Sequence, residues 1–256
     1  MSNAPMSFIF FFFIPFPTLS VLVLLAPLSI VLSMNLSFIT PPSETGSTMS
    51  SSVHDLVLFS TWDCLSETHT LDKVQYFDMV FPDLPSLEDA FSTAAISFAP
   101  DLLDVLQSDT APTSSFFKSL PAKPDNKTWA VYVLVLEKPD HETGIYIDSG
   151  TNTKGGVLYR WNEYDKNKRL PSNVEAALNE HYTIAHKDML CWALRPTPAS
   201  TPVCRLLFYA LEATFAYLFW AYADSGFRGS NTAMSCHWDR DTLEYNGLRS
   251  HVALVD

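Results

Sequence analysis

Two tyrosines and an arginine within residues 129–164 have the types and spacing to form one polar site. Tyr132 lies on one predicted strand and Tyr146 on the next, and Arg160 lies one turn into the helix that follows. Tyr164 comes four residues after Arg160, so these two side chains share a face of that helix. The stretch therefore combines strong secondary-structure signals with polar side chains that can converge, which makes it the candidate functional site. The alternative is that the tyrosines pack across a sheet and Arg160 pairs with a neighbouring acid.

A single glutamate, Glu212, interrupts the apolar stretch Val203–Ala223. An ionised carboxylate in such surroundings is costly unless it is paired with a base or coordinates a metal ion. The sequence offers Arg160 and Arg205 as partners, and otherwise leaves Glu212 as a candidate cation ligand. An acid at the centre of the stretch also argues against a membrane-spanning helix here.

The elements that position these side chains follow from hydrophobic periodicity and turn residues. The predicted order is strand, strand, helix, helix, strand and long helix, at Ala130–Glu137, Gly144–Asp148, from about Val157, Ser172–Glu180, Tyr182–Ala193 and Val203–Ala223. A hairpin and a third strand make a small sheet. The predicted fold class is therefore α+β, with a small three-stranded, mainly antiparallel sheet flanked by helices.

Charge is distributed unevenly along the 256 residues, whose formal net charge is −12. Residues 44–128 hold 13 acids and 4 bases, whereas residues 129–224 hold 11 acids and 9 bases. A negative net charge ordinarily argues against a nucleic-acid partner, but the nearly neutral second segment permits phosphate binding. The scattered cysteines form no recognisable disulfide framework, so reduced thiols are expected. Cys236, His237 and His251 are candidate zinc ligands, although without a Cys-x-x-Cys pair they make a poor zinc site.

The first 42 residues form an apolar segment that is typical of a signal or a membrane anchor. Residues 8–39 contain no charged side chain and exceed the roughly 20 residues that span a bilayer, which predicts membrane association or secretion. No lysine or arginine precedes this run, so the orienting charge of a signal peptide is missing. The alternative is a translation start at Met34 or Met49, which would place the protein in the nucleus or cytoplasm.

The rest of the chain divides by composition. Residues 43–53 and 108–128 are rich in Pro, Ser and Thr and are predicted linkers. The segments between and after them are an acidic, partly helical region at 54–107, the α+β domain at 129–223 and a tail at 224–256.

Five short motifs, taken in order, resemble the GIY-YIG nuclease superfamily over the length of the predicted α+β domain. The matching residues are Val131-Tyr132-Val133 on the first strand, Tyr146-Ile147-Asp148 on the second, Arg160 in GVLYRWNEY, Tyr164 one turn later and Glu212 in YALEATF. The resemblance implies a metal-dependent endonuclease that hydrolyses the phosphodiester bonds of DNA.

The resemblance also implies a role for each matching side chain. Glu212 would bind one Mg²⁺ or Mn²⁺ ion that keeps most of its waters. Arg160 would hold the non-bridging phosphate oxygens. Tyr132 would relay a proton from the attacking water, which requires a pKa below its usual value of about 10. Tyr146 would orient the scissile phosphate, and Tyr164 would add a hydrogen bond.

The chain departs from the family pattern at Asp148, because the second motif of the family ends in glycine. A carboxylate beside the phosphate site would repel the substrate. The asparagine that follows the glutamate in many members has two candidates here, Asn231 and Asn246. One alternative is therefore a catalytically degenerate binding module of the same fold. Another is a membrane-tethered interaction protein in which the acidic residues 54–128 are the functional part.

Overall fold

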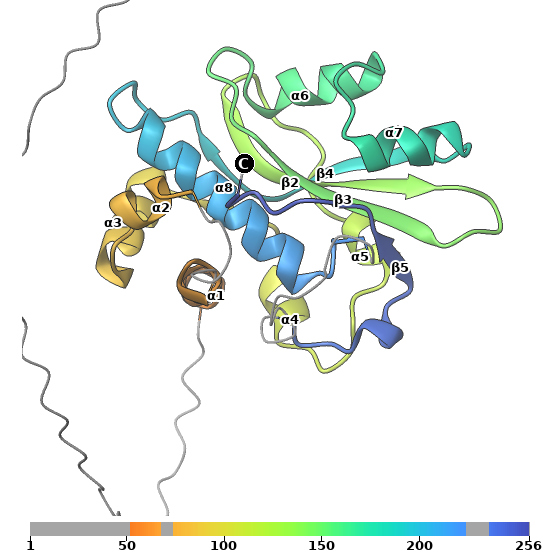
Figure 1. The fold of residues 1–256 in the computed structure, drawn as a ribbon, viewed down its shortest axis with the longest axis horizontal. Helices are drawn as coiled ribbons and strands as arrows, with labels where there is room; N and C mark the ends of the chain where they lie inside the picture. The colour runs from red at the N-terminus through yellow and green to blue at the C-terminus, as the bar shows by residue number, and fades with distance from the viewer. Residues whose placement is uncertain (1–51, 68–73, 224–235, 256) are drawn as a thin grey trace, which may run out of the picture. The chain divides into compact units, whose positions relative to one another are not determined.

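The computed structural model describes residues 52–67, 74–223 and 236–255, all of which belong to one compact unit, Met49–Asp256 (Figure 1). The apolar run at 8–39 and both alternative start sites lie outside the described residues. Within the described part of the chain, no helix is both long enough and apolar enough to cross a membrane.

Five strands form one mixed sheet in the order β1-β4-β2-β3-β5. Their bounds are Ser97–Phe98 for β1, Thr128–Glu137 for β2, Thr143–Gly150 for β3, Thr183–Leu194 for β4 and Tyr245–Gly247 for β5. The central strand, β2, is antiparallel to both β3 and β4. At the edges, β1 is antiparallel to β4 and β5 is parallel to β3.

The prediction of a small three-stranded, mainly antiparallel sheet is wrong, because a strand is added at each edge. β1 comes from the acidic region that precedes the hairpin, and β5 comes from the C-terminal tail. Strands of two and three residues are too short to show the alternation of apolar and polar residues by which strands are detected. The three long strands occupy the segments in which the sequence predicts strands.

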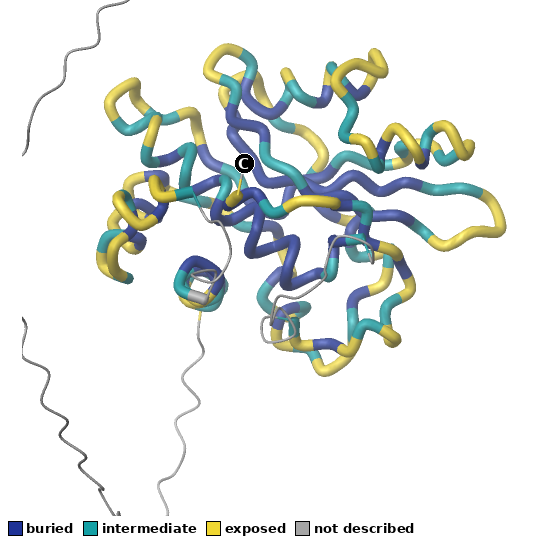
Figure 2. The backbone as a smooth tube through the Cα atoms, viewed as in Figure 1, coloured by how far each residue is buried: buried dark blue, intermediate teal, exposed yellow. Residues whose placement is uncertain are grey.

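Helices cover both faces of the sheet, and β2 is therefore buried along almost its whole length (Figure 2). Successive side chains of a strand point to opposite faces. Val131, Val133 and Val135 accordingly join the larger hydrophobic core, whereas Tyr132 and Leu134 join a smaller one on the other face.

Each core has its own helices (Figure 1). The smaller core is covered by α6 (Gly156–Asp165) and α7 (Ser172–Asn179). The larger core is covered by α8 (Thr201–Leu218), which packs in turn against α1 (Val53–Glu67) and α3 (Leu84–Ala94). Because α8 lies between the sheet and these helices, it is buried on nearly all sides, as its apolar sequence indicates.

The shorter helices are α2 at Tyr76–Val80, α4 at Leu102–Leu106, α5 at Ser114–Lys118 and a 3₁₀ turn at Arg240–Thr242. α5 falls within the predicted linker at 108–128, and its Phe117 is fully buried in the larger core. This segment therefore packs on the sheet.

The second half of the acidic region predicted to be partly helical is divided into α3, β1 and α4. α3 ends at Ala94, and its C-cap residue, Ala95, has a left-handed φ of 49°. Its N-cap is Asp83, whose carboxylate oxygen accepts the backbone N–H of Ser86 over 2.9 Å.

Candidate functional site

The carboxylate of Asp148 lies at the centre of the predicted site. The hydroxyls of Tyr132 and Tyr164 donate to its Oδ2 over 2.9 Å and 3.0 Å. Arg160 Nε lies 3.4 Å from the same oxygen, and the backbone N–H of Ser149 donates to Oδ1 over 2.8 Å. Three residues that the sequence predicts as site residues thus converge on the one that departs from the family pattern.

Local geometry explains this convergence. Tyr132 and Asp148 are directly opposite in the β2–β3 register, so their side chains share a face of the sheet. The chain then enters α6 through Gly156, whose φ is +54°. A Cβ at this position would lie 2.2 Å from the carbonyl oxygen of Thr128, so only glycine allows the helix to start this close to β2.

Arg160 is held on three sides. Its Nη1 donates to Glu163 Oε2 over 3.0 Å and to the carbonyl oxygen of Arg169 over 2.7 Å. Its guanidinium also lies 4.7 Å from the centre of the Tyr164 ring, a cation–π distance. Together with the contact to Asp148, these interactions engage both Nε and Nη1 within the protein.

The surroundings of the tyrosines oppose proton transfer from water. Burial raises the pKa of Tyr132 well above its usual value, and the Asp148 carboxylate raises it further. The pKa of Tyr164 is raised by the same two causes. The exposed fractions of the two residues are 0 % and 2 %. A general base requires a lowered pKa, so the structure gives Tyr132 the opposite of what the implied role needs.

Tyr146 lies further along the same face of the hairpin, opposite Leu134. It is 3 % exposed, and burial followed by Asp148 raises its pKa. Glu212 and Arg249 also act electrostatically on its hydroxyl. Tyr146 therefore interacts electrostatically with Asp148 and with a second charge, which is buried.

That second charge is Glu212, which forms a buried ion pair. Nη2 of Arg249 contacts its Oε1, and the two side chains are only 1 % (Arg249) and 5 % (Glu212) exposed. Arg249 is also fixed by the backbone, because Nε donates to the carbonyl oxygen of His251 and Nη1 to that of Ile147, each over 2.6 Å. The guanidinium is thus satisfied on three sides, as a buried charge requires.

The partners that the sequence offers for Glu212 lie elsewhere. Arg205 donates to the carbonyl oxygen of Thr151 and lies over the ring of Trp129. The residue that sequence reasoning missed is Arg249, which reaches Glu212 from the C-terminal segment. The only indication in the sequence is that Arg249 is a base close to β5, a strand that is too short to be predicted.

A divalent metal ion does not fit beside Glu212 as the residues stand. Burial raises the pKa of this carboxyl, and Arg249 opposes the rise. A metal ion on the carboxylate would meet the guanidinium at contact distance, where two cations in a low-dielectric interior repel strongly. In the described ranges, no group of three or more His, Cys, Asp or Glu is arranged to hold a metal ion.

The remaining candidates have other partners. Cys236 Sγ donates to the carbonyl oxygen of Leu218, and His237 lies 3.5 Å from Asp109, so these two predicted zinc ligands face different groups. The four cysteines, all within the described residues, form no disulfide.

Of the two asparagine candidates, Asn246 donates to Glu142 Oε2 over 2.5 Å. Asn231 lies outside the described residues.

Comparison with known proteins finds no family model, no curated protein and no solved structure that matches this chain.

Proposed function

We propose that this domain, which resembles the GIY-YIG nucleases, binds duplex DNA without cleaving it. The observation that carries the proposal is the set of donors around Asp148. The resemblance gives Tyr132, Tyr164 and Arg160 roles in the catalytic site, with Arg160 on the phosphate oxygens, and all three point at one carboxylate oxygen of Asp148. The protein's own carboxylate thus occupies the place of the anion.

The negative charge of Asp148 would repel a substrate phosphate strongly enough to prevent cleavage at this site. A phosphate oxygen reaching Tyr132 or Arg160 would come within about 4 Å of this carboxylate, where like charges repel by about 4 kcal/mol at an effective dielectric constant of 20. That energy corresponds to a loss of roughly a thousandfold in affinity at this position.

The surroundings of Glu212 also argue against cleavage, because they concern the metal ion that cleavage would need. Its carboxylate already has a guanidinium where a hydrolase of this type needs a metal ion. Phosphodiester hydrolysis would need a substrate phosphate and a metal ion to enter from solution. Here Asp148 lies at the position of the anion and Arg249 at the position of the cation.

Support for DNA binding comes from the segment around α6. Residues 151–170 contain five bases and two acids. Both acids pair with bases: Glu163 with Arg160 and Arg169, and Asp165 with Lys187.

Most of these bases face solvent. Lys154, Lys166, Lys168 and Arg169 are exposed, as is the Tyr159 ring at 44 %. Exposed cations of this kind bind the DNA backbone without reading its sequence, with dissociation constants of about 10⁻⁴ to 10⁻⁶ M.

A cleavage assay tests the catalytic half of the proposal. The full chain is incubated with supercoiled plasmid and either Mg²⁺ or Mn²⁺, beside the matched variant Glu212→Gln. We expect no nicking by either protein. Nicking by the wild type that Glu212→Gln removes would show a working nuclease and overturn the proposal.

A binding assay tests the other half. Fluorescence anisotropy with a labelled duplex should show weak, salt-dependent binding. The double variant Lys166→Glu/Lys168→Glu should lower the slope of log K against log salt by about 2, because two phosphate contacts are lost. Lys123→Glu, an exposed lysine outside the α6 segment, is the control and should leave the slope unchanged. Equal effects of the two variants would remove the support for DNA binding at α6.

A further inference from the structure

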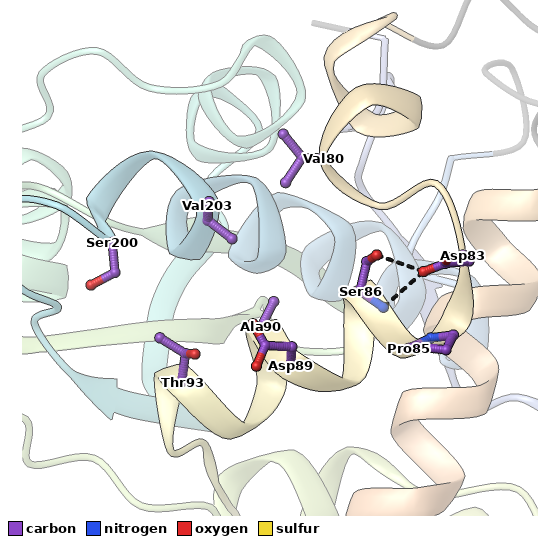
Figure 3. A pocket seen from close by; sticks show the side chains of 9 residues that line it. All are labelled: Val80, Asp83, Pro85, Ser86, Asp89, Ala90, Thr93, Ser200 and Val203. Atoms are coloured by element: carbon purple, nitrogen blue, oxygen red, sulfur yellow. Dashed lines mark hydrogen bonds between the residues drawn. The ribbon is translucent and has the colours of Figure 1, made fainter.

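A groove lies between α3 and the start of α8, on the face of the sheet opposite Asp148 (Figure 3). Its volume is about 590 Å³, within the range of sites that bind ligands. Figure 3 shows Ser200, which directly precedes α8, and Val203 of α8 facing α3 across the hollow, with Val80 at its upper end. Binding in this groove would not depend on the function proposed for the Asp148 face of the sheet.

The spacing of α3 explains how the groove forms. Leu87, Phe91 and Ala94 anchor one face of the helix in the larger core. A neighbouring stripe turns toward the groove, and its members are Ser86, Asp89, Ala90 and Thr93. These positions are i, i+3, i+4 and i+7, which lie on one face of an α-helix. One side of the groove is therefore built by a single helix face.

The groove combines an apolar floor with an acidic rim. Val80, Ala90 and Val203 supply the apolar part. Two aspartates, Asp83 and Asp89, lie on the rim. The side chain of Asp83 is engaged as the cap of α3, so Asp89 is the carboxylate left to meet a ligand.

The segments that contain α1 to α4 carry formal charge of one sign. Residues 74–107 contain six acids and no lysine or arginine, and residues 53–67 contain three acids and likewise no lysine or arginine. Surfaces of one sign favour partners of the other and speed their approach.

Helix α2, whose last residue Val80 lines the groove, carries two exposed apolar side chains. Tyr76 and Met79 are 64 % and 68 % exposed, and Met79 directly precedes the lining residue Val80. Aromatic residues and methionine are enriched in protein interfaces, and lysine is depleted. The apolar area is too exposed to serve the core, which indicates a partner.

We propose that this groove binds a short basic segment of another protein, in which a lysine or arginine is followed by a small aliphatic side chain. The cation would meet Asp89, and the aliphatic group would lie against Ala90 and Val203. Apolar grooves bind peptides through their apolar side chains, and complementary charges fix the partner and its register.

Binding to the full chain would be measured by fluorescence anisotropy with two labelled probe peptides, Gly-Lys-Val-Lys-Val-Gly and Gly-Glu-Val-Glu-Val-Gly. We expect the lysine peptide to bind and the glutamate peptide not to bind. Asp89→Lys should weaken binding of the lysine peptide about tenfold or more. Glu88→Lys makes the same charge change at the adjacent exposed residue, outside the lining, and should retain most of the binding.

Thr93→Trp is a second variant that fills the groove and leaves the charge unchanged, and it should also abolish binding. It keeps the test decisive if Asp89→Lys lowers the melting temperature of the fold. Equal losses in Asp89→Lys and Glu88→Lys would show unspecific attraction to an acidic surface and overturn the proposal. Failure of the lysine peptide to bind, or sedimentation showing that a second copy of the chain covers the groove, would also overturn it.

Discussion

Asp148 is a partly buried carboxylate on β3, and Glu212 is a fully buried one on α8, and the protein satisfies them in different ways. Asp148 accepts hydrogen bonds from two hydroxyls, a backbone N–H and a guanidinium, all contributed within residues 132–164. Glu212 has one dominant partner, Arg249, which comes from a separate segment of the chain. The comparison shows two ways to stabilise a carboxylate. Asp148 is bound by several donors that can replace one another, whereas Glu212 depends on Arg249 alone as its cation.

The largest expected effect follows from removing Arg249. Arg249→Ala leaves the Glu212 carboxylate buried without a cation, which typically costs about 3–5 kcal/mol in the free energy of unfolding. Chemical denaturation monitored by circular dichroism measures this loss. The double variant Glu212→Leu/Arg249→Met should recover most of it, because an apolar pair of similar volume leaves no buried charge. A single variant that costs less than about 1 kcal/mol would contradict the importance assigned to the pair.

A smaller loss is expected for Asp148→Ala, about 1–3 kcal/mol in the same measurement, because several buried donors lose their acceptor. The hydroxyls of Tyr132 and Tyr164 lie 3.1 Å apart, so each can still bond to the other and limit the loss. If Asp148→Ala proved as damaging as Arg249→Ala, the distinction between shared and single partners would fail.

Asp188 on β4 sharpens the comparison, since it is a buried carboxylate whose only charged neighbour within 4 Å in the described structure is His186, at 3.5 Å. Burial raises its pKa to about 6, and His186 opposes the rise. The folded protein therefore holds this proton more tightly than the unfolded chain, so stability should fall as pH rises from about 4 to about 6 and then level off.

Asp188→Asn should flatten that pH dependence and stabilise the fold at pH 7.5 by roughly 3 kcal/mol at most, the value that corresponds to a shift of about two pKa units. Urea denaturation at several pH values provides the test. A variant with the same slope as the wild type between pH 4 and 6 would show that Asp188 is not the titrating group.

The smallest effect is expected for Tyr132→Phe, at about 1 kcal/mol in the free energy of unfolding. Asp148 keeps Tyr164, Arg160 and the Ser149 N–H as donors, so the loss of one hydroxyl is partly compensated. Tyr164→Phe is the matched variant and should cost a similar amount. A loss above about 3 kcal/mol for either would show that the donors are not interchangeable.

The Asp148 cluster could be largely predicted from the sequence because it is local. Alternation along the hairpin places Tyr132 on one face, and helical spacing puts Arg160 and Tyr164 together. Asp148 was also recognisable as a departure from the family pattern. What the sequence pattern could not show is that the carboxylate turns toward the donors, because this depends on the register that pairs Asp148 with Tyr132.

The Glu212 pair could only be half predicted. The cost of a lone carboxylate in an apolar helix requires a partner, and that expectation is satisfied. Arg249 could not be chosen in advance, because it reaches Glu212 through a parallel pairing of only three residues and backbone bonds between Arg249 and Ala221 and Ala223. Such long-range contacts leave no periodic signal in the sequence.

The most direct test of whether Asp148 fills an anion site is chemical rescue by formate, which has the size of the missing carboxylate. The melting temperature of Asp148→Ala is compared in sodium formate and in sodium chloride at equal ionic strength, beside the wild type and Asp188→Ala. The account predicts that formate at about ten times its dissociation constant raises the melting temperature of Asp148→Ala alone, by roughly 3 °C. An equal response of wild type and Asp148→Ala, or rescue of Asp188→Ala as well, would contradict it.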